Sequence, residues 1–93
     1  MLRISMDEIA YAVCLNTAER LNVPVDSVAV DLLYDEDLGY SAEVKAQGRE
    51  RILIEANIKE AIIRYVDVTY GKRVYPADIT LDVEDEIWAE IAD

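Results

Sequence analysis

A chain of 93 residues that is 53% hydrophobic is long enough to bury one core, and its composition is unlike that of disordered proteins. Its 20 acidic and 9 basic residues give a formal net charge of −11, which repels nucleic-acid phosphates and anionic membrane surfaces. We therefore expect one domain over residues 1–93 that binds neither nucleic acid nor membrane.

The residue types most used in catalysis are scarce. The sequence has no histidine, the commonest general base, and a single cysteine, Cys14. Because Cys14 lies in the apolar run YAVCL, we interpret it as an inert buried thiol. One cysteine forms no internal disulfide, and MLRISMDEIA lacks the apolar stretch of an export signal, so we expect a cytoplasmic protein.

The first predicted element is a helix from about residue 5 to residue 21. Ser5 and Glu8 have the spacing of a capping box, in which each residue bonds the backbone N–H of the other. Apolar or small side chains then recur at helical spacing, at Met6, Ala10, Val13, Thr17 and Leu21. Pro24 restricts the residue before it and ends the helix.

Three segments with a period of two follow and predict an antiparallel β-meander. The first turn is DEDLG, and the second is AQG with Gly48 in the left-handed conformation. The cross-strand pairs expected from these turns are Tyr34 with Tyr40, Ala42 with Ile52, Tyr40 with Ile54, and Glu43 with Arg51.

A second helix is predicted from Asn57, as the cap, to Gly71, which stops it. The last segment fits two structures: ITLDV alternates like a strand, whereas Val83, Ile87 and Ile91 are spaced by four like one face of a helix. We favour a helix from about Asp82, whose acidic run at residues 84–86 would lie in the first turn.

The predicted fold class is α+β, in the order α-β-β-β-α-α. A three-stranded antiparallel meander would carry the helices packed on one face. The alternative adds a short fourth strand near residues 79–83, which would change the free edge of the sheet.

The acidic loop of the first hairpin is the candidate metal site. Asp35 and Asp37, with Asp31 nearby in sequence, offer carboxylate ligands suited to calcium or magnesium. An EF-hand is excluded, because with Asp35 as the first ligand the position of the bidentate glutamate is taken by Ala46. We prefer a hairpin turn, which aspartate and Gly39 favour.

Aromatic side chains supply the candidates for a protein interface, namely Tyr11, Tyr70, Tyr75 and Trp88. Packing of Trp88 in the core is the preferred alternative for that residue. Phosphate loops, dinucleotide fingerprints, zinc ligand sets and serine triads are not found in the sequence, so we expect no cofactor and no enzymatic activity.

Four stretches, SMDEIAYAVCL, LLYDEDLGYSAEV, ILIEANIKEAI and YGKRVYPADITLDVEDEIWAEI, resemble the YxcD-like family of small acidic proteins from Bacillus-type bacteria. The resemblance spans nearly the whole chain and implies a bacterial, cytoplasmic, single-domain protein. The family is a domain of unknown function, so the resemblance implies no catalytic residue.

Three functions are compatible with these features. The leading hypothesis is a non-enzymatic protein–protein interaction module with an unknown protein partner or a second copy of itself, because small sheets leave free edges. A divalent-metal sensor or enzyme would use Asp35 and Asp37. A mimic of nucleic acid would bind a basic protein through the −11 charge.

Overall fold

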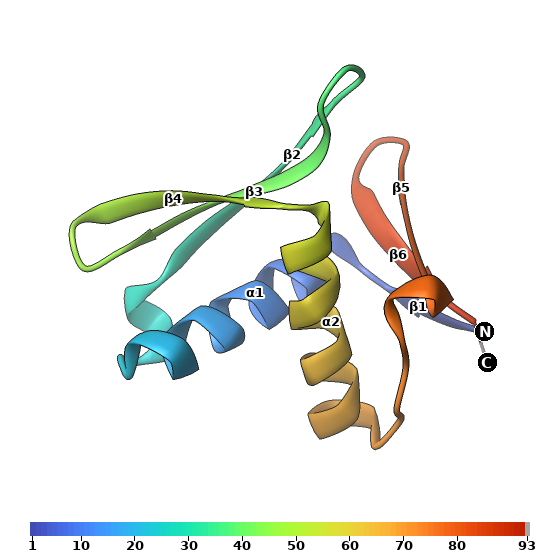
Figure 1. Cartoon of the computed structure of the whole chain (residues 1–93), viewed down its shortest axis with the longest axis horizontal. Helices are drawn as coiled ribbons and strands as arrows, with labels where there is room; N and C mark the ends of the chain where they lie inside the picture. The colour runs from blue at the N-terminus through green and yellow to red at the C-terminus, as the bar shows by residue number, and fades with distance from the viewer. Residues whose placement is uncertain (93) are drawn as a thin grey trace.

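The computed structural model describes residues 1–92 and shows an α+β fold with two antiparallel sheets (Figure 1). Asp93, the last residue of the predicted domain, lies outside the described residues. The elements in chain order are β1 (Leu2–Ile4), α1 (Met6–Leu21), the 3₁₀ turn η1 (Val25–Ser27), β2 (Ala29–Asp35), β3 (Gly39–Ala46), β4 (Arg49–Ile54), α2 (Glu55–Tyr70), the 3₁₀ turn η2 (Pro76–Asp78), β5 (Ile79–Val83) and β6 (Ile87–Ile91). The sheets have the strand orders β2-β3-β4 and β1-β6-β5.

The prediction of the first helix is confirmed. The Ser5 side chain accepts a hydrogen bond from the Glu8 backbone N–H at 3.2 Å, and the Glu8 carboxylate accepts one from the Ser5 N–H at 3.4 Å. Asn22, in the left-handed conformation with φ 56°, ends the helix just before Pro24. Local sequence signals therefore define both ends of α1.

The second helix is also present, but it begins earlier than predicted, at Glu55. Asn57 is not the cap residue; it lies in the first turn, where its side-chain oxygen accepts a hydrogen bond from the Ile54 N–H at 3.1 Å. Gly71 ends the helix with φ 65°, as expected. β4 thus passes directly into α2 without a loop.

The predicted meander is the β2-β3-β4 sheet, and Tyr34 does lie opposite Tyr40. The predicted register between β3 and β4 is wrong by one residue, since Ala42 lies opposite Leu53 and Glu43 opposite Ile52. The remaining observed pairs include Ser41 with Ile54 and Val44 with Arg51.

The cause of the register error is the turn. Gln47 and Gly48 both have positive φ, 55° and 71°, which is the backbone of a tight two-residue hairpin loop. The predicted loop has three residues and includes Ala46, but in the structure Ala46 pairs with Arg49. A one-residue slip exchanges the faces of a strand, so the side chains of β4 predicted to point inward point outward.

The predicted C-terminal helix is wrong. Residues 79–91 form the hairpin of β5 and β6, so the alternative of a strand near residues 79–83 is correct, although this strand belongs to the second sheet. Val83 and Ile87 lie opposite each other across the β5–β6 turn, and Ile87 and Ile91 lie on one face of β6, so the spacing of four fits the hairpin as well as a helix. The acidic residues 84–86 form the turn, in which the Glu84 N–H donates to the Glu86 carbonyl.

The core lies where α1 and α2 pack against each other and against both sheets, so the helices are not confined to one face of a single meander. β1 was not predicted; it pairs with β6 and lets the N-terminal segment complete the second sheet. The largest fully buried side chains come from β1, both helices and β6, and they are Ile4, Ile9, Val13, Ile58, Ile62, Val66 and Ile91. None of the helices in residues 1–92 is both long and apolar enough to cross a membrane.

Candidate functional site

The acidic loop between β2 and β3 is held by its own backbone. One carboxylate oxygen of Asp35 accepts hydrogen bonds from the backbone N–H groups of Asp37 at 2.8 Å and Leu38 at 3.1 Å. Asp31 is four residues away on the extended strand, about 13 Å along it. The structure therefore does not bring Asp31 to the loop, and in residues 1–92 there is no group of three or more His, Cys, Asp or Glu residues placed to share a metal ion.

Two of the four candidate interface residues, Tyr11 and Tyr70, contact the ring of the buried Tyr65. Their rings meet the Tyr65 ring edge to face, with centroid distances of 6.3 Å for Tyr11 and 6.1 Å for Tyr70. Tyr75 is exposed in the segment before η2, where its backbone N–H donates to the Asp78 carboxylate at 2.9 Å. The tyrosine cluster thus joins α1 to α2, and Tyr75 has no ring contact with it in the described part of the chain.

The Glu8 carboxylate completes this cluster. One oxygen accepts hydrogen bonds from the hydroxyl groups of Tyr70 at 2.6 Å and Tyr65 at 3.0 Å. The Tyr70 hydrogen bond lowers the pKa of Glu8. Burial, followed by the hydrogen bond to Glu8, raises the pKa of Tyr65 to about 12. At neutral pH the Glu8 carboxylate is ionised and accepts hydrogen bonds from protonated tyrosine hydroxyl groups. These bonds link α1 to α2. A carboxylate with a lowered pKa is not a general base poised near pH 7.

Sequence reasoning missed this cluster because Glu8 is 57 residues from Tyr65 and 62 from Tyr70. Glu8 carried a strong local signal as the capping residue, and it does fill that role with its other oxygen. A single sequence contains no signal for the second role.

Trp88 lies on β6 between the buried residues Ile87 and Ala89, so its side chain points to the outer face of the second sheet and not into the core. The Arg3 guanidinium lies 4.4 Å from the centre of its ring. The indole N–H is buried and has no hydrogen-bond acceptor in residues 1–92. Trp88 is therefore half-buried, with Arg3 over its ring.

Cys14 is half-buried on α1, where its thiol donates to the Val28 carbonyl at 3.6 Å. Burial raises the pKa of this thiol, which lowers the fraction present as the nucleophilic thiolate.

The most exposed apolar surface of the sheets comes from the observed register of β4. Ile52 and Ile54 are 58% and 62% exposed on the outer face of the β2-β3-β4 sheet, and Leu33 on the same face is 44% exposed. Leu33 and Ile54 are both opposite Ser41, so they lie in one row across the sheet. We call Leu33, Ile52 and Ile54 the outer patch.

β4 is also a free edge of its sheet. In a two-residue hairpin, the residues that flank the turn bond each other, so Arg49, Arg51 and Leu53 direct their backbone groups to β3. Glu50 and Ile52 then direct theirs to solvent, while the Ile54 N–H is taken by Asn57. The sequence-based register placed Ile52 and Ile54 inward and so hid this surface.

Residues 1–86 match the family described as "Protein of unknown function (DUF2653)". Neither a curated protein nor a solved structure matches the sequence. The family match does not test the YxcD-like name or the Bacillus-type origin, which stay predictions. Because the match covers most of the chain, the protein belongs to the DUF2653 family, whose function is unknown.

Proposed function

We propose that this protein is a non-enzymatic interaction module that self-associates through β4. The observation that carries the proposal is the outer patch beside a free strand edge, because exposed apolar edge strands are natural sites of strand addition. β4 contains neither proline nor lysine, which commonly protect an edge from such pairing, and its charged residues are confined to positions 49–51, before the apolar residues 52–54.

A second copy of the chain fits this edge when the two β4 strands run antiparallel about a twofold axis at Ile52. The backbone groups of Glu50 and Ile52 point outward, so only registers that pair even-numbered residues with even-numbered residues form hydrogen bonds. An axis at Arg51 would place Arg51 opposite itself, and an axis at Glu50 would place Glu50 opposite itself.

The axis at Ile52 avoids both repulsions. Ile52 would face Ile52 of the second copy, and Arg51 would face Leu53, so no like charges lie directly opposite in the strand. The result would be one continuous sheet of six strands with apolar contact on its outer face. Leu33 and Ile54 extend that apolar surface on each side.

Sedimentation velocity over a range of protein concentrations tests the proposal. We expect a concentration-dependent dimer for the native chain and a monomer for Ile52→Arg, because the substitution places two like charges face to face at the axis. Leu38→Arg is the matched control, since Leu38 is an apolar residue that is 87% exposed at the distant β2–β3 turn.

The control variant should dimerise like the native chain. A native chain that stays monomeric at all concentrations, or an Ile52→Arg variant that dimerises as well as Leu38→Arg, would remove β4 as the interface. Circular dichroism of each variant separates loss of pairing from loss of fold.

A further inference from the structure

A small cleft lies on the inner side of the β2-β3-β4 sheet, on the opposite face from the outer patch. It is bounded by the second half of α1, by β3 and β4, and by the first turn of α2. Its main cavity has a volume of about 110 Å³, and a narrower one adjoins it at Thr17, Leu21, Val44 and Arg51. Arg49 lies at one end and Arg20 at the other, so we call Arg20, Arg49 and Arg51 the arginine cleft.

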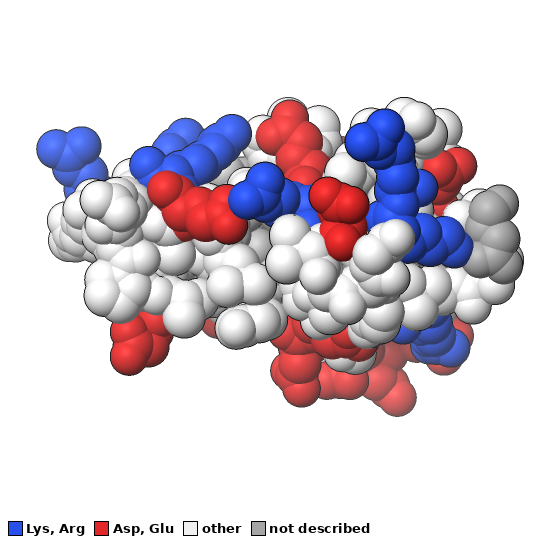
Figure 2. All heavy atoms as spheres, turned by 90° about the horizontal axis from the view of Figure 1, so that it is seen from below, with Lys and Arg blue, Asp and Glu red and all other residues white. Residues whose placement is uncertain are grey.

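Two of these arginines lack a carboxylate partner. Within residues 1–92, the side chains of Arg49 and Arg51 form neither an ion pair nor a hydrogen bond, although the chain has 20 acidic and 9 basic residues. Figure 2 shows that most Lys and Arg side chains visible from that side lie along one edge, interspersed with Asp and Glu, while the opposite edge carries mainly Asp and Glu. Arginine in the cleft is therefore available to an external anion.

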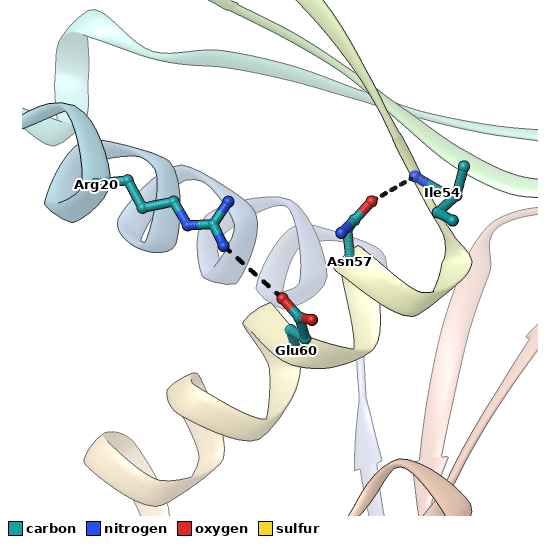
Figure 3. A network of polar contacts seen from close by, with 4 residues as sticks. All are labelled: Arg20, Ile54, Asn57 and Glu60. Atoms are coloured by element: carbon teal, nitrogen blue, oxygen red, sulfur yellow. Dashed lines mark hydrogen bonds and ion pairs between the residues drawn. The ribbon is translucent and has the colours of Figure 1, made fainter.

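Polar groups from both helices face the same space (Figure 3). The Asn57 side-chain oxygen is engaged by the Ile54 N–H, which leaves its NH₂ group turned toward the Arg20 side of the cleft. Arg20 reaches from α1 toward Glu60 on α2, with 3.9 Å between the guanidinium nitrogen and the carboxylate oxygen. This long, exposed ion pair holds Arg20 beside the cleft and is weak enough to be exchanged for another anion.

We propose that the arginine cleft binds a small oxyanion of the phosphate or carboxylate class. Guanidinium groups bind the paired oxygens of either group in a fork. Here Arg49 and Arg51 of β4 line the main cavity, and Arg20 and Asn57 line the narrower one that adjoins it. A cavity of about 110 Å³ is far smaller than the roughly 300 to 1,000 Å³ of sites for drug-sized ligands, so the ligand is small. Glu60 lines the adjoining narrow cavity, where its carboxylate competes with an external anion for Arg20.

Nuclear magnetic resonance titration of the full chain tests this inference, with inorganic phosphate in one arm and succinate in the other. Sodium chloride at matched ionic strength is the control, because salt alone screens the −11 charge. We expect saturable shifts of backbone amides at residues 16–21, 44–51 and 57–60 in at least one arm, and the arm with tighter binding identifies the anion.

Arg51→Gln should weaken binding by about tenfold or more, because one charge-assisted hydrogen bond is lost. Arg73→Gln removes the same charge in the segment after α2 and should change the affinity by less than about twofold. Glu60→Gln should tighten binding, since it removes the competing carboxylate. Arg49→Gln provides a second test if Arg51→Gln does not fold.

Shifts that match those in chloride would overturn the proposal. Equal losses of affinity in Arg51→Gln and Arg73→Gln would also overturn it, because they would show a general effect of charge without a site.

Discussion

The β1-β6-β5 sheet is made of strands of three, five and five residues, yet most of its inward positions are buried, namely Ile4, Ile79, Leu81, Ile87, Ala89 and Ile91. The β2-β3-β4 sheet has strands of seven, eight and six residues and buries only Leu32, Ala42 and Val44. Its β2–β3 turn extends away from the helices, and its outer face carries the exposed outer patch (Figure 1). The length of the strands therefore does not indicate how much a sheet contributes to the core. The β1-β6-β5 sheet, which we call the short sheet, supplies mainly buried side chains, whereas the β2-β3-β4 sheet, the long sheet, supplies mainly exposed ones.

The largest effect should follow from truncating the short sheet. Ile91→Ala removes a fully buried side chain between Leu2 and Ile79 and should lower the free energy of unfolding by about 2 to 5 kcal/mol. Ile52→Ala in the long sheet should change it by less than about 0.5 kcal/mol for the monomer, because Ile52 is exposed. Urea unfolding at low protein concentration measures the free energy of unfolding of both variants. Equal losses of stability would contradict the difference between the two sheets.

Proline substitutions in β4 distinguish the backbone N–H groups that bond β3 from those that point to solvent. Leu53→Pro removes the N–H that bonds β3 and should lower the free energy of unfolding by about 1 to 3 kcal/mol, because a ladder hydrogen bond is lost. Ile52→Pro removes an N–H that points to solvent, so the monomer should keep its fold and most of its stability while dimerisation is lost. Thermal unfolding combined with sedimentation tests both outcomes, and a Leu53→Pro variant as stable as Ile52→Pro would contradict the register.

The helices between the sheets should show an alkaline transition. Since the pKa of Tyr65 is raised to about 12, its stabilisation is complete below the unfolded pKa of about 10 and is lost as the pH rises through the folded pKa. Between pH 9 and pH 12, the native chain should lose about 1 to 2 kcal/mol more than Tyr65→Phe, which cannot titrate at this position. Parallel curves for the two proteins in urea unfolding would contradict the raised pKa of Tyr65.

The smallest effect is expected at the turn of the long sheet. Asp35→Asn keeps a side-chain oxygen for the Asp37 and Leu38 N–H groups, so the free energy of unfolding should change by less than about 0.5 kcal/mol. Millimolar calcium or magnesium should not raise the thermal midpoint beyond a control of matched ionic strength. A rise in the native chain that Asp35→Asn abolishes would instead assign a metal site to this loop.

Local chemistry determined much of this fold from the sequence alone. The capping box of Ser5 and Glu8, the stop at Gly71 and the pairing of Tyr34 with Tyr40 were all predictable, because each depends on residues near one another in the chain. The net charge of −11 likewise comes from composition alone.

Tertiary structure decided the rest. The backbone conformation of Gln47 and Gly48 set the register that exposes Ile52 and Ile54 and turns Arg51 toward the cleft, and a shift of one residue reverses the faces of a strand. Pairing with β1 and β5 made residues 87–91 a strand, because apolar residues spaced by four satisfy a helix and a strand equally well until a partner is present. The Glu8 cluster and the arginine cleft each join side chains from distant segments, which only the folded chain brings together.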